Sequence, residues 1–492
     1  MRKNGILLPI SSLPSPYGIG CFSKEAYEFV DFLKEAGQEY WQVLPLGPTG
    51  YGDSPYQAFS TFAGNPYFVD LEDLIAKHWL TAKDCEKEDY GTNPEYVDYE
   101  KIFFSRFKLL KKAYKKSKIA ENPDFQAFIK ENAFWLDDYA LYMAIKNKFK
   151  GGSYTKWPDD IRLRKASAMK AYKNDAKIAD EANFYRFIQY MFYTQWAKLK
   201  AYANENGIDI IGDIPIYVSM DSSDTWAYPE LFQLDKDNVP IAVAGCPPDY
   251  FSETGQLWGN PLYNWDYHKK TGYAWWMQRL AHCFKMYDVV RIDHFRGFDE
   301  YYSIPYGDKT AVYGHWEKGP GAELFETMKK KLGKQRIIAE DLGFLTPSVI
   351  KMVKKCGYPG MKILEFAFDS DTENTYLPHN FESNCVVYTG THDNATVFEW
   401  FPTLKKKDQK FVKDYMNIRS AKDVGWGLIR MALASVADTA IIPMQDYLEL
   451  GSEARMNIPS TLGGNWAWRL KENAYSRELA KKISDLAKVY GR

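Results

Sequence analysis

The amino-acid sequence predicts an α/β protein built on a (β/α)8 barrel, with a large, mainly helical insertion between the second and third strands. Three observations lead to this prediction. Short, almost continuously apolar runs recur along the chain, helical patterns separate several of them, and one connection is far longer than an ordinary loop. A doubly wound open sheet is the competing architecture, because it also alternates buried parallel strands with helices.

Eight apolar runs have the composition of strands that are covered on both faces, and Gly, Pro or Asp bounds them. The runs are residues 5–10, 40–46, 208–214, 289–293, 336–341, 361–368, 384–391 and 439–445. Eight parallel strands are the number that closes a barrel of this type.

Helical patterns follow the first strand and precede the third. The first predicted helix has Ser23 as its N-cap and a glycine as its stop, and Phe29, Phe32 and Leu33 form its apolar face. A second helix is predicted over residues 184–206, where apolar residues recur at helical spacing up to a terminating glycine.

The connection between the second and third strands indicates an inserted subdomain. It is roughly 160 residues long, whereas ordinary connections have a few residues. We therefore predict a mainly helical insertion over residues 65–184, with residues 1–64 and 185–492 forming the barrel and its long loops. Lys-rich runs at 108–118 and 146–150 are typical of solvated helix faces.

Composition excludes several classes of partner. The net charge of −1 over 492 residues argues against nucleic acid or an anionic membrane as the main partner. The N-terminal apolar run is short and broken by Pro9, and no run of about 18 apolar residues is present, so we expect a cytoplasmic protein. Six scattered cysteines predict neither disulfides nor a structural zinc site. The 16% aromatic content fits a large core or surfaces that stack on sugars.

Acidic residues fall at the carboxyl ends of four predicted strands. Asp213 and Asp293 close two runs, Glu340 and Asp341 close another, and Asp393 follows a fourth. In a barrel these ends share one face, where active sites are assembled. A single acidic residue there is also explained as a helix cap. A cluster of like charges is costly, however, and indicates a functional site.

Such a cluster suits glycosyl transfer, in which positive charge develops on the substrate and two carboxyl groups share the chemistry. Arg291, His294 and His392 flank the carboxylates. The chain has no G-x-S-x-G nucleophile elbow, phosphate-binding loop or G-x-G-x-x-G motif after a strand. The segment 235–238 lacks the later ligands of a calcium loop and is interpreted as a solvated turn.

Several motifs resemble those of one family over essentially the whole chain. They are GILLPISSLP (5–14), QVLPLGPT (42–49), DSPYQ (53–57), GDIPIYV (212–218), GQLWGNPLY (255–263), RIDHFRG (291–297), AEDLG (339–343) and GTHDN (390–394). The sequence is similar to the 4-α-glucanotransferases called amylomaltase or disproportionating enzyme, glycoside hydrolase family 77 of the α-amylase superfamily. The RIDH and THDN blocks alone indicate only the superfamily, whereas the WGNPLY loop and the N-terminal blocks are more specific.

The resemblance implies roles for individual residues. Asp293 matches the nucleophile, Glu340 the general acid/base, and Asp393 the third carboxylate, which holds the 2- and 3-hydroxyls and stabilises the transition state. Arg291 and His392 match donor-subsite neighbours. We expect the pKa of Glu340 to be raised by burial and nearby carboxylates, and Arg291 to keep Asp293 ionised.

Further positions match residues that line the substrate subsites. These are Ser54, Tyr56, Asp213 and the loop of Trp258. Tyr250, Phe251 and Tyr263 also fall in loops expected to ring the carboxylates, where aromatic rings stack on sugars and exclude water. Asp341 is expected to face away from the pocket, because neighbours in a strand point to opposite sides.

The resemblance implies a 4-α-glucanotransferase that works by retaining double displacement on α-1,4-glucans and maltooligosaccharides, with glucose as a further acceptor. No metal and no cofactor is expected. About 45 residues follow the eighth strand, so no C-terminal β-sandwich domain is predicted. Two alternatives are an α-glucan hydrolase of the same superfamily and a non-catalytic glucan-binding protein. The oligomeric state, monomer or homodimer, is left open.

Overall fold

Eight parallel strands form one sheet in the computed structural model, which describes residues 2–50, 52–248, 252–343, 345–369 and 371–492. The strands are β1 (Lys3–Leu7), β2 (Tyr40–Gln42), β3 (Asp209–Pro215), β6 (Val289–Asp293), β9 (Ile337–Ala339), β10 (Gly360–Ile363), β11 (Cys385–Tyr388) and β12 (Thr439–Pro443). Their order is β10-β11-β12-β1-β2-β3-β6-β9.

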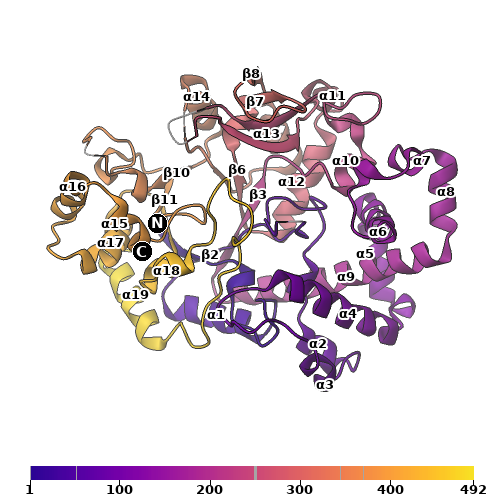
Figure 1. Cartoon of the computed structure of the whole chain (residues 1–492). Helices are drawn as coiled ribbons and strands as arrows, with labels where there is room; N and C mark the ends of the chain where they lie inside the picture. Colours follow the sequence, from indigo (N-terminus) through magenta and orange to yellow (C-terminus); the bar gives the residue numbers. More distant parts are fainter. Residues whose placement is uncertain (1, 51, 249–251, 344, 370) are drawn as a thin grey trace.

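The two ends of this sheet meet. The backbone N–H of Ala339 at the end of β9 donates to the carbonyl of Pro359, directly before β10, at 3.0 Å. The sheet therefore closes almost completely on itself, and its strands β2, β3 and β6 lie near the centre of the molecule in Figure 1. The predicted barrel is confirmed, and the doubly wound open sheet is wrong.

Each predicted apolar run overlaps one barrel strand, but most strands are shorter than the runs. The run 40–46 contributes only Tyr40–Gln42 to β2, and Val43 adds one further backbone bond, to Ile211 at 2.9 Å. Its remaining residues leave the sheet yet stay buried under the loops above the barrel. The apolar pattern therefore predicts which residues are buried. The length of each strand depends instead on where the backbone leaves the sheet.

The helix after β1 has the predicted position. Helix α1 spans Lys24–Glu35 and buries Phe29, Phe32 and Leu33. Ser23 occupies the N-cap position, but its hydroxyl bonds the Glu25 carboxylate and no backbone N–H bonds to it. Ser23 therefore stands at the N-cap position without a side-chain bond to the helix backbone.

Most of the insertion is helical and forms the lobe at the right of Figure 1. Its helices are α2 (Leu71–Ala76), α3 (Ala82–Glu86), α4 (Tyr99–Ser117), α5 (Pro123–Glu131), α6 (Ala133–Lys148), α7 (Asp159–Arg162), α8 (Ala166–Asn174) and α9 (Ala176–Glu205). The helix predicted to start at residue 184 starts at Ala176, so the expected boundary at 184 lies inside α9.

Helix α9 connects the insertion to the barrel. The Gln189 side chain bonds the backbone N–H and carbonyl of Gly64 at 2.7 and 2.9 Å. The indole N–H of Trp196 donates to the carbonyl of Met286 at 3.0 Å. One continuous helix therefore belongs to both parts. The division into a barrel (residues 1–64 and 185–492) and an insertion (residues 65–184) stays a prediction.

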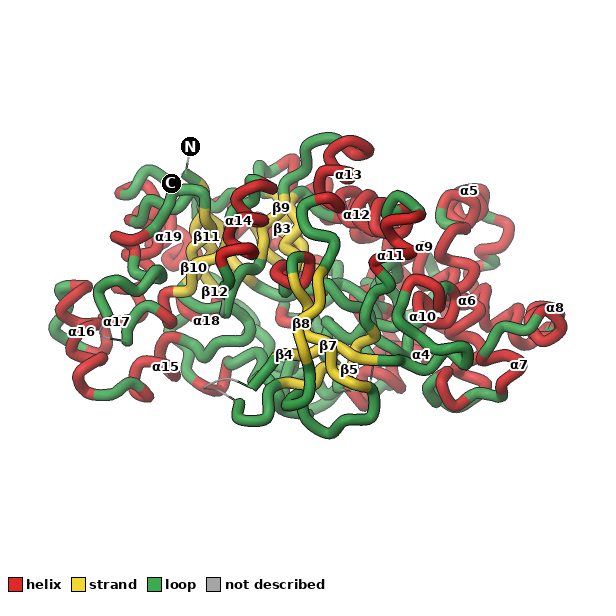
Figure 2. The backbone as a smooth tube through the Cα atoms, turned by 90° about the horizontal axis from the view of Figure 1, so that it is seen from above, coloured by secondary structure: helices red, strands yellow, loops and turns green. Residues whose placement is uncertain are grey.

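A second, antiparallel sheet was not predicted. It has the order β5-β4-β7-β8, from β4 (Ala242–Cys246), β5 (Gln256–Pro261), β7 (Glu300–Pro305) and β8 (His315–Lys318). It is built from the connections after β3 and β6, lies apart from the barrel strands in Figure 2, and carries Trp258.

The remaining helices cover the barrel and its C-terminal side. They are α10 (Ser223–Ala227), α11 (Trp265–Lys270), α12 (Ala274–Met286), α13 (Glu323–Leu332), α14 (Pro347–Cys356), α15 (Val397–Thr403), α16 (Lys406–Met416), α17 (Val424–Ala434), α18 (Met444–Tyr447) and α19 (Arg477–Val489). Within the described ranges no strand follows β12. None of the described helices is long and apolar enough to cross a membrane.

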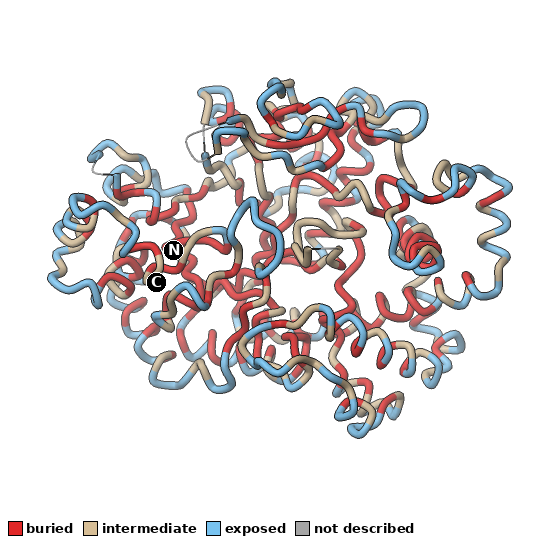
Figure 3. The backbone as a smooth tube through the Cα atoms, in the orientation of Figure 1, coloured by how far each residue is buried: buried red, intermediate tan, exposed pale blue. Residues whose placement is uncertain are grey.

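Aromatic side chains contribute heavily to the core. Buried residues run through the barrel strands and the inner faces of the helices in Figure 3. Trp41, Trp196, Trp226 and Trp276 are among the largest fully buried side chains. Much of the aromatic excess therefore belongs to packing.

Candidate active site

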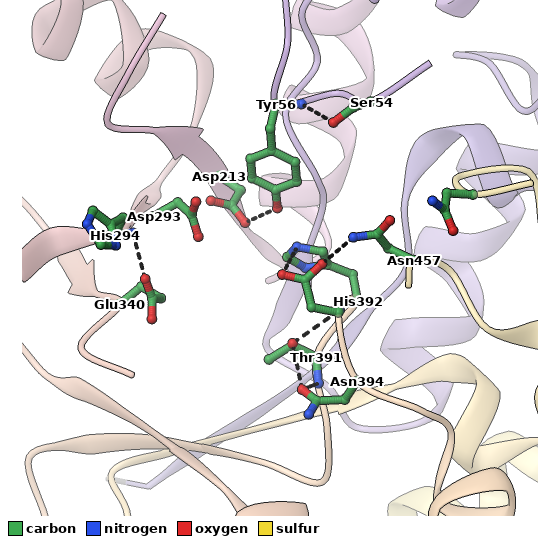
Figure 4. Close-up of polar contacts among 12 residues, drawn as sticks. Ser54, Tyr56, Asp213, Asp293, His294, Glu340, Thr391, His392, Asn394 and Asn457 are labelled. Atoms are coloured by element: carbon green, nitrogen blue, oxygen red, sulfur yellow. Dashed lines mark hydrogen bonds and ion pairs between the residues drawn. The ribbon is translucent and has the colours of Figure 1, made fainter. Parts of the chain in front are cut away.

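The acidic residues singled out in the sequence gather at the carboxyl ends of the barrel strands. Asp293 is the last residue of β6, Glu340 directly follows β9, and Asp393 lies in the turn after β11. Asp213 lies within β3, next to β6 in the sheet. Figure 4 shows Asp213, Asp293 and Glu340 on neighbouring elements.

Arg291 links two of these carboxylates. Its Nη1 donates to both oxygens of Asp213 at 2.8 and 2.6 Å, and its Nη2 donates to Asp293 Oδ1 at 3.0 Å. The Asp213 side chain is 0% exposed, so it acts on Arg291 from beneath the pocket. Asp213 was predicted to bind substrate, and the structure places it where it positions Arg291 and Tyr56.

Glu340 is held by two backbone groups. The N–H of His294 donates to its Oε2 at 2.6 Å, and the N–H of Leu342 donates to its Oε1 at 2.9 Å. His294 has a left-handed backbone (φ 53°), a conformation that is uncommon outside glycine and frequent at functional sites. Burial also lowers the pKa of the His294 ring to about 3, so the ring is neutral.

The two central carboxyl groups differ in protonation. Burial, and then the charge of Asp293, raise the pKa of Glu340 to about 8. Burial also raises the pKa of Asp293, but the Arg291 guanidinium in contact with it opposes that shift. The surroundings therefore favour a protonated Glu340 at neutral pH, while Arg291 favours the charged form of Asp293.

Asp393 is the most exposed of the three carboxylates. Its side chain is 46% exposed, and its Oδ1 accepts a hydrogen bond from Asn457 Nδ2 at 2.7 Å. Its Oδ2 lies 3.4 Å from His392 Nε2. Asn394 accepts from Thr391 N–H at 2.9 Å and closes the turn between them (Figure 4).

Tyr56 covers the other side of this turn. Its ring is stacked on His392, with centroids 5.1 Å apart and planes 18° apart, and its hydroxyl donates to Asp213 Oδ2 at 2.9 Å. Burial and the Asp213 charge raise the pKa of Tyr56, so the phenol stays a donor. Ser54 Oγ accepts from the N–H of Tyr56 at 3.3 Å and shapes the turn.

Of the aromatic loop residues that were predicted to surround the carboxylates, the structure describes some and not others. Trp258 is half-buried, its Nε1 donates to Gln256 Oε1 at 3.0 Å, and its ring meets His294 edge to face at 4.8 Å. Tyr250 and Phe251 lie outside the described residues.

Tyr263 was predicted to ring the pocket, and this prediction is wrong. The side chain is 1% exposed, its hydroxyl donates to the Ile216 carbonyl at 2.8 Å, and its ring stacks on Phe232 at 5.4 Å. Tyr263 therefore fills the core beneath the loop that carries Trp258.

Asp341 faces away from the pocket, as predicted. Its Oδ1 accepts from the N–H of Met361 at 2.7 Å, which fixes the start of β10 against the end of β9. Asp341 therefore helps to close the barrel.

Two pocket residues were missed in the sequence. Asn457 binds Asp393, and the Trp466 ring lies 5.8 Å from both Tyr56 and His392. They bound the segment 457–466, whose Asn, Gly and Pro content after the last strand is the only local signal. Within the described part of the chain, no three His, Cys, Asp or Glu side chains are grouped to hold a metal ion.

Comparison with known proteins identifies the family. The family model described as 4-alpha-glucanotransferase (glycoside hydrolase family 77) matches residues 8–475. The chain belongs to this 4-alpha-glucanotransferase family. The resemblance inferred from the sequence motifs is thereby confirmed.

Individual 4-alpha-glucanotransferases match over their full length. The chain is 52% identical to that of Clostridium butyricum, covering 98% of this chain and 99% of the other, and 46% identical to that of Thermus thermophilus, covering 100% and 99%. Its structure matches an amylomaltase from Streptococcus agalactiae in complex with acarbose with a TM-score of 0.97, at 42% identity and full coverage of both chains. A Corynebacterium glutamicum amylomaltase, 16% identical with a TM-score of 0.77 over 99% of this chain and 75% of that one, shares the fold.

The chain is thus a 4-alpha-glucanotransferase that acts on α-1,4-glucans. The three carboxylates, Arg291 and His392 lie where an enzyme of this barrel class assembles its active site.

Proposed function

We propose that this 4-alpha-glucanotransferase moves a segment of a maltooligosaccharide onto the 4-hydroxyl of a second glucan, or of glucose, by two successive displacements at one carbon. The observation that carries the proposal is an arginine-bound carboxylate beside a carboxyl group of raised pKa. Asp293 is bound to Arg291 at 3.0 Å, and the pKa of Glu340 is about 8.

In the first displacement, protonated Glu340 gives its proton to the glycosidic oxygen while an Asp293 oxygen attacks C1. The bond from C1 to the leaving glucan breaks, and an ester joins the donor sugar to Asp293. Arg291 is already paired with Asp213 and Asp293, so it stays in place while the Asp293 charge is consumed.

In the second displacement, Glu340 is ionised and takes the proton of the acceptor 4-hydroxyl. The acceptor oxygen attacks C1 and the Asp293 carboxylate leaves, so the α configuration is retained. Retention requires two carboxyl groups about 5–5.5 Å apart, which residues on the adjacent strands β6 and β9 can supply.

The other site residues hold the sugars. We assign Asp393 to the 2- and 3-hydroxyls of the donor sugar, because its side chain is exposed to the pocket while Asn457 fixes one oxygen. We assign His392, whose ring stacks on Tyr56, to the same donor sugar. Trp258 is assigned to stacking on a sugar face.

Two observations support an α-glucan ligand and a catalytic site. The Streptococcus agalactiae relative is a complex with acarbose. All three carboxylates are present here, which argues against a non-catalytic glucan-binding protein. A hydrolase is the alternative within the same chemistry. Transfer prevails if the acceptor sites hold a sugar and exclude water, which is the role we give to the aromatic loops.

Incubation of the pure protein with maltotriose tests this proposal. Transfer produces glucose together with maltopentaose and longer chains, because the maltosyl group left on the enzyme when glucose departs is placed on another maltotriose. Chromatography of the products at early times gives the answer. Glucose and maltose without longer chains would identify a hydrolase.

We also propose that the enzyme works in the cytoplasm. Cys21, Cys85, Cys283, Cys356 and Cys385 are free thiols in the structure, as in a reducing compartment. Fractionation of the source cells, with the activity measured in each fraction, tests this placement.

A further inference from the structure

Two segments of the chain are joined at two points beside Asp393. The first segment, residues 391–399, carries Asp393 in its turn and Glu399 in α15. The second segment carries Arg455 and Asn457. Asn457 Nδ2 donates to Asp393 Oδ1 at 2.7 Å, and Arg455 Nη1 donates to Glu399 Oε1 at 3.0 Å.

Arg455 also controls the backbone of its own segment. Its Nε donates to the carbonyl of Asn457 at 3.0 Å, while Nη1 holds Glu399. The guanidinium is a rigid planar fork, so binding both partners fixes the distance between α15 and the backbone of Asn457. The two side chains of the ion pair are only 22% and 21% exposed, which limits solvent screening.

The ion pair lies over buried acidic groups. Glu365 is 8% exposed and Asp446 is 1% exposed. Burial raises the pKa of Glu365 well above its usual range and that of Asp446 to about 6. Among the described residues, Glu365 Oε1 and Glu399 Oε2 have no hydrogen-bond partner. Arg455 therefore brings positive charge to a buried acidic cluster, and its loss would leave Glu399 unpaired.

We propose that Arg455 is a positioning residue for the transfer reaction. Clamped by Glu399, it sets the backbone so that the Asn457 amide holds the Asp393 carboxylate in one orientation. This inference rests on the proposed role of Asp393 at the 2- and 3-hydroxyls. The Asp393 side chain is 46% exposed, and His392 Nε2, at 3.4 Å, is its ion-pair contact among the described residues, so without the clamp its carboxylate rotates away from the sugar. A misplacement of about 1 Å costs on the order of 100-fold in rate.

Three variants measured with maltotriose test the proposal. Arg455→Met removes both bonds, and we expect kcat to fall by about 30- to 100-fold with KM within about threefold, because hydrogen bonds to the 2-hydroxyl strengthen in the transition state. Arg455→Lys keeps the charge but cannot hold both partners, so its loss should be about three- to tenfold. Arg186→Met removes a comparable pair, with Asp137 at 2.7 Å in the insertion, and should leave kcat unchanged.

A double variant distinguishes a positioning role of Arg455 from a merely structural one. If Arg455 acts through Asn457, then Asn457→Ala and Arg455→Met remove the same effect. The double variant should then be within about twofold of the worse single variant. Losses that multiply, a loss confined to KM, or an Arg455→Met enzyme within about twofold of wild type would overturn the proposal.

Two further measurements keep the outcome decisive. If circular dichroism shows that Arg455→Met does not fold, Glu399→Gln preserves the side-chain volume and one acceptor, and its kcat should fall by about three- to tenfold. An unchanged kcat in that variant contradicts the clamp. Asp393→Asn tests the proposed function separately, since an active Asp393→Asn enzyme would remove the role of Asp393 whatever Arg455 does.

Discussion

At the scale of single residues, Asp293 and Glu340 show how surroundings assign opposite roles to the same functional group. Both are buried, which raises both pKa values. Asp293 contacts the Arg291 guanidinium, whereas Glu340 faces the negative charge of Asp293. The raised pKa favours a protonated Glu340 near neutral pH, and the Arg291 guanidinium favours the charged form of Asp293, as the proposed roles of acid and nucleophile require.

The pKa of Glu340 predicts the alkaline limit of the activity. Its folded-state pKa, about 8, is raised, so the protonated acid is present below pH 8 and is lost as the pH rises through that value. We expect kcat/KM for maltotriose to fall about tenfold per pH unit above roughly pH 8, because this ratio reports the free enzyme. Initial rates from pH 5 to 10 measure it.

A donor with a better leaving group provides the control. Fluoride leaves from α-maltotriosyl fluoride without protonation, so the first displacement no longer needs the acid. kcat/KM for this donor should stay level through pH 8. An alkaline fall at the same pH for both donors would assign the limit to another group.

Some residues of the site could be predicted from the sequence and others could not. Asp293 and Glu340 were predictable because each ends an apolar run, and parallel strands bring their carboxyl ends to one face. Asn457 could not be predicted, because its role depends on a contact with Asp393, which lies 64 residues earlier in the sequence. Tyr263 was placed wrongly, since a motif shows that an aromatic residue lies in a loop but not which way its ring points.

At the scale of elements, the barrel strands were predicted in number and order because parallel strands covered on both faces are apolar throughout. The small antiparallel sheet was missed. Its outer strand β8 (His315–Lys318) is largely exposed, and β5 (Gln256–Pro261) alternates only weakly, so no apolar run marks them. Helix α9 was predicted too short, because among its first eight residues only Ile178 and Ala182 are buried.

The packing of β3 against the end of α12 makes a prediction about stability. A Cβ added to Gly212 would lie 2.2 Å from the Tyr287 ring, which is buried and cannot move freely. We expect Gly212→Ala to destabilise the protein by about 1–3 kcal/mol through overpacking. A lower midpoint of urea unfolding, followed by tryptophan fluorescence, is the expected result.

Gly427→Ala is the matched comparison. In helix α17 an added Cβ would approach the flexible end of Met416, with the sulfur at 3.1 Å, and alanine has the better helix propensity by about 1 kcal/mol. Its unfolding midpoint should be equal to or above that of wild type. Equal urea-unfolding midpoints for Gly212→Ala and wild type would contradict the prediction, because they would show that the Tyr287 ring shifts to accommodate the added methyl group.

At the scale of the whole molecule, the chain combines a barrel, a helical insertion and long loops into one site for a neutral polymer. The net charge of −1 suits a substrate that carries no charge. Helix α9 runs from the insertion to the barrel, which couples the two parts more closely than the predicted boundary at residue 184 implies. The sequence could not show this, because a domain boundary is usually placed where composition changes.

The covalent role of Asp293 is the claim on which the whole mechanism depends, and trapping the intermediate tests it most directly. In Glu340→Gln, α-maltotriosyl fluoride can still glycosylate the enzyme, while the missing base slows the second displacement. Mass spectrometry of the quenched and digested protein should find a maltotriosyl group on the peptide that contains Asp293. No adduct, or an adduct on the peptide of Asp213 or Asp393, would contradict the mechanism.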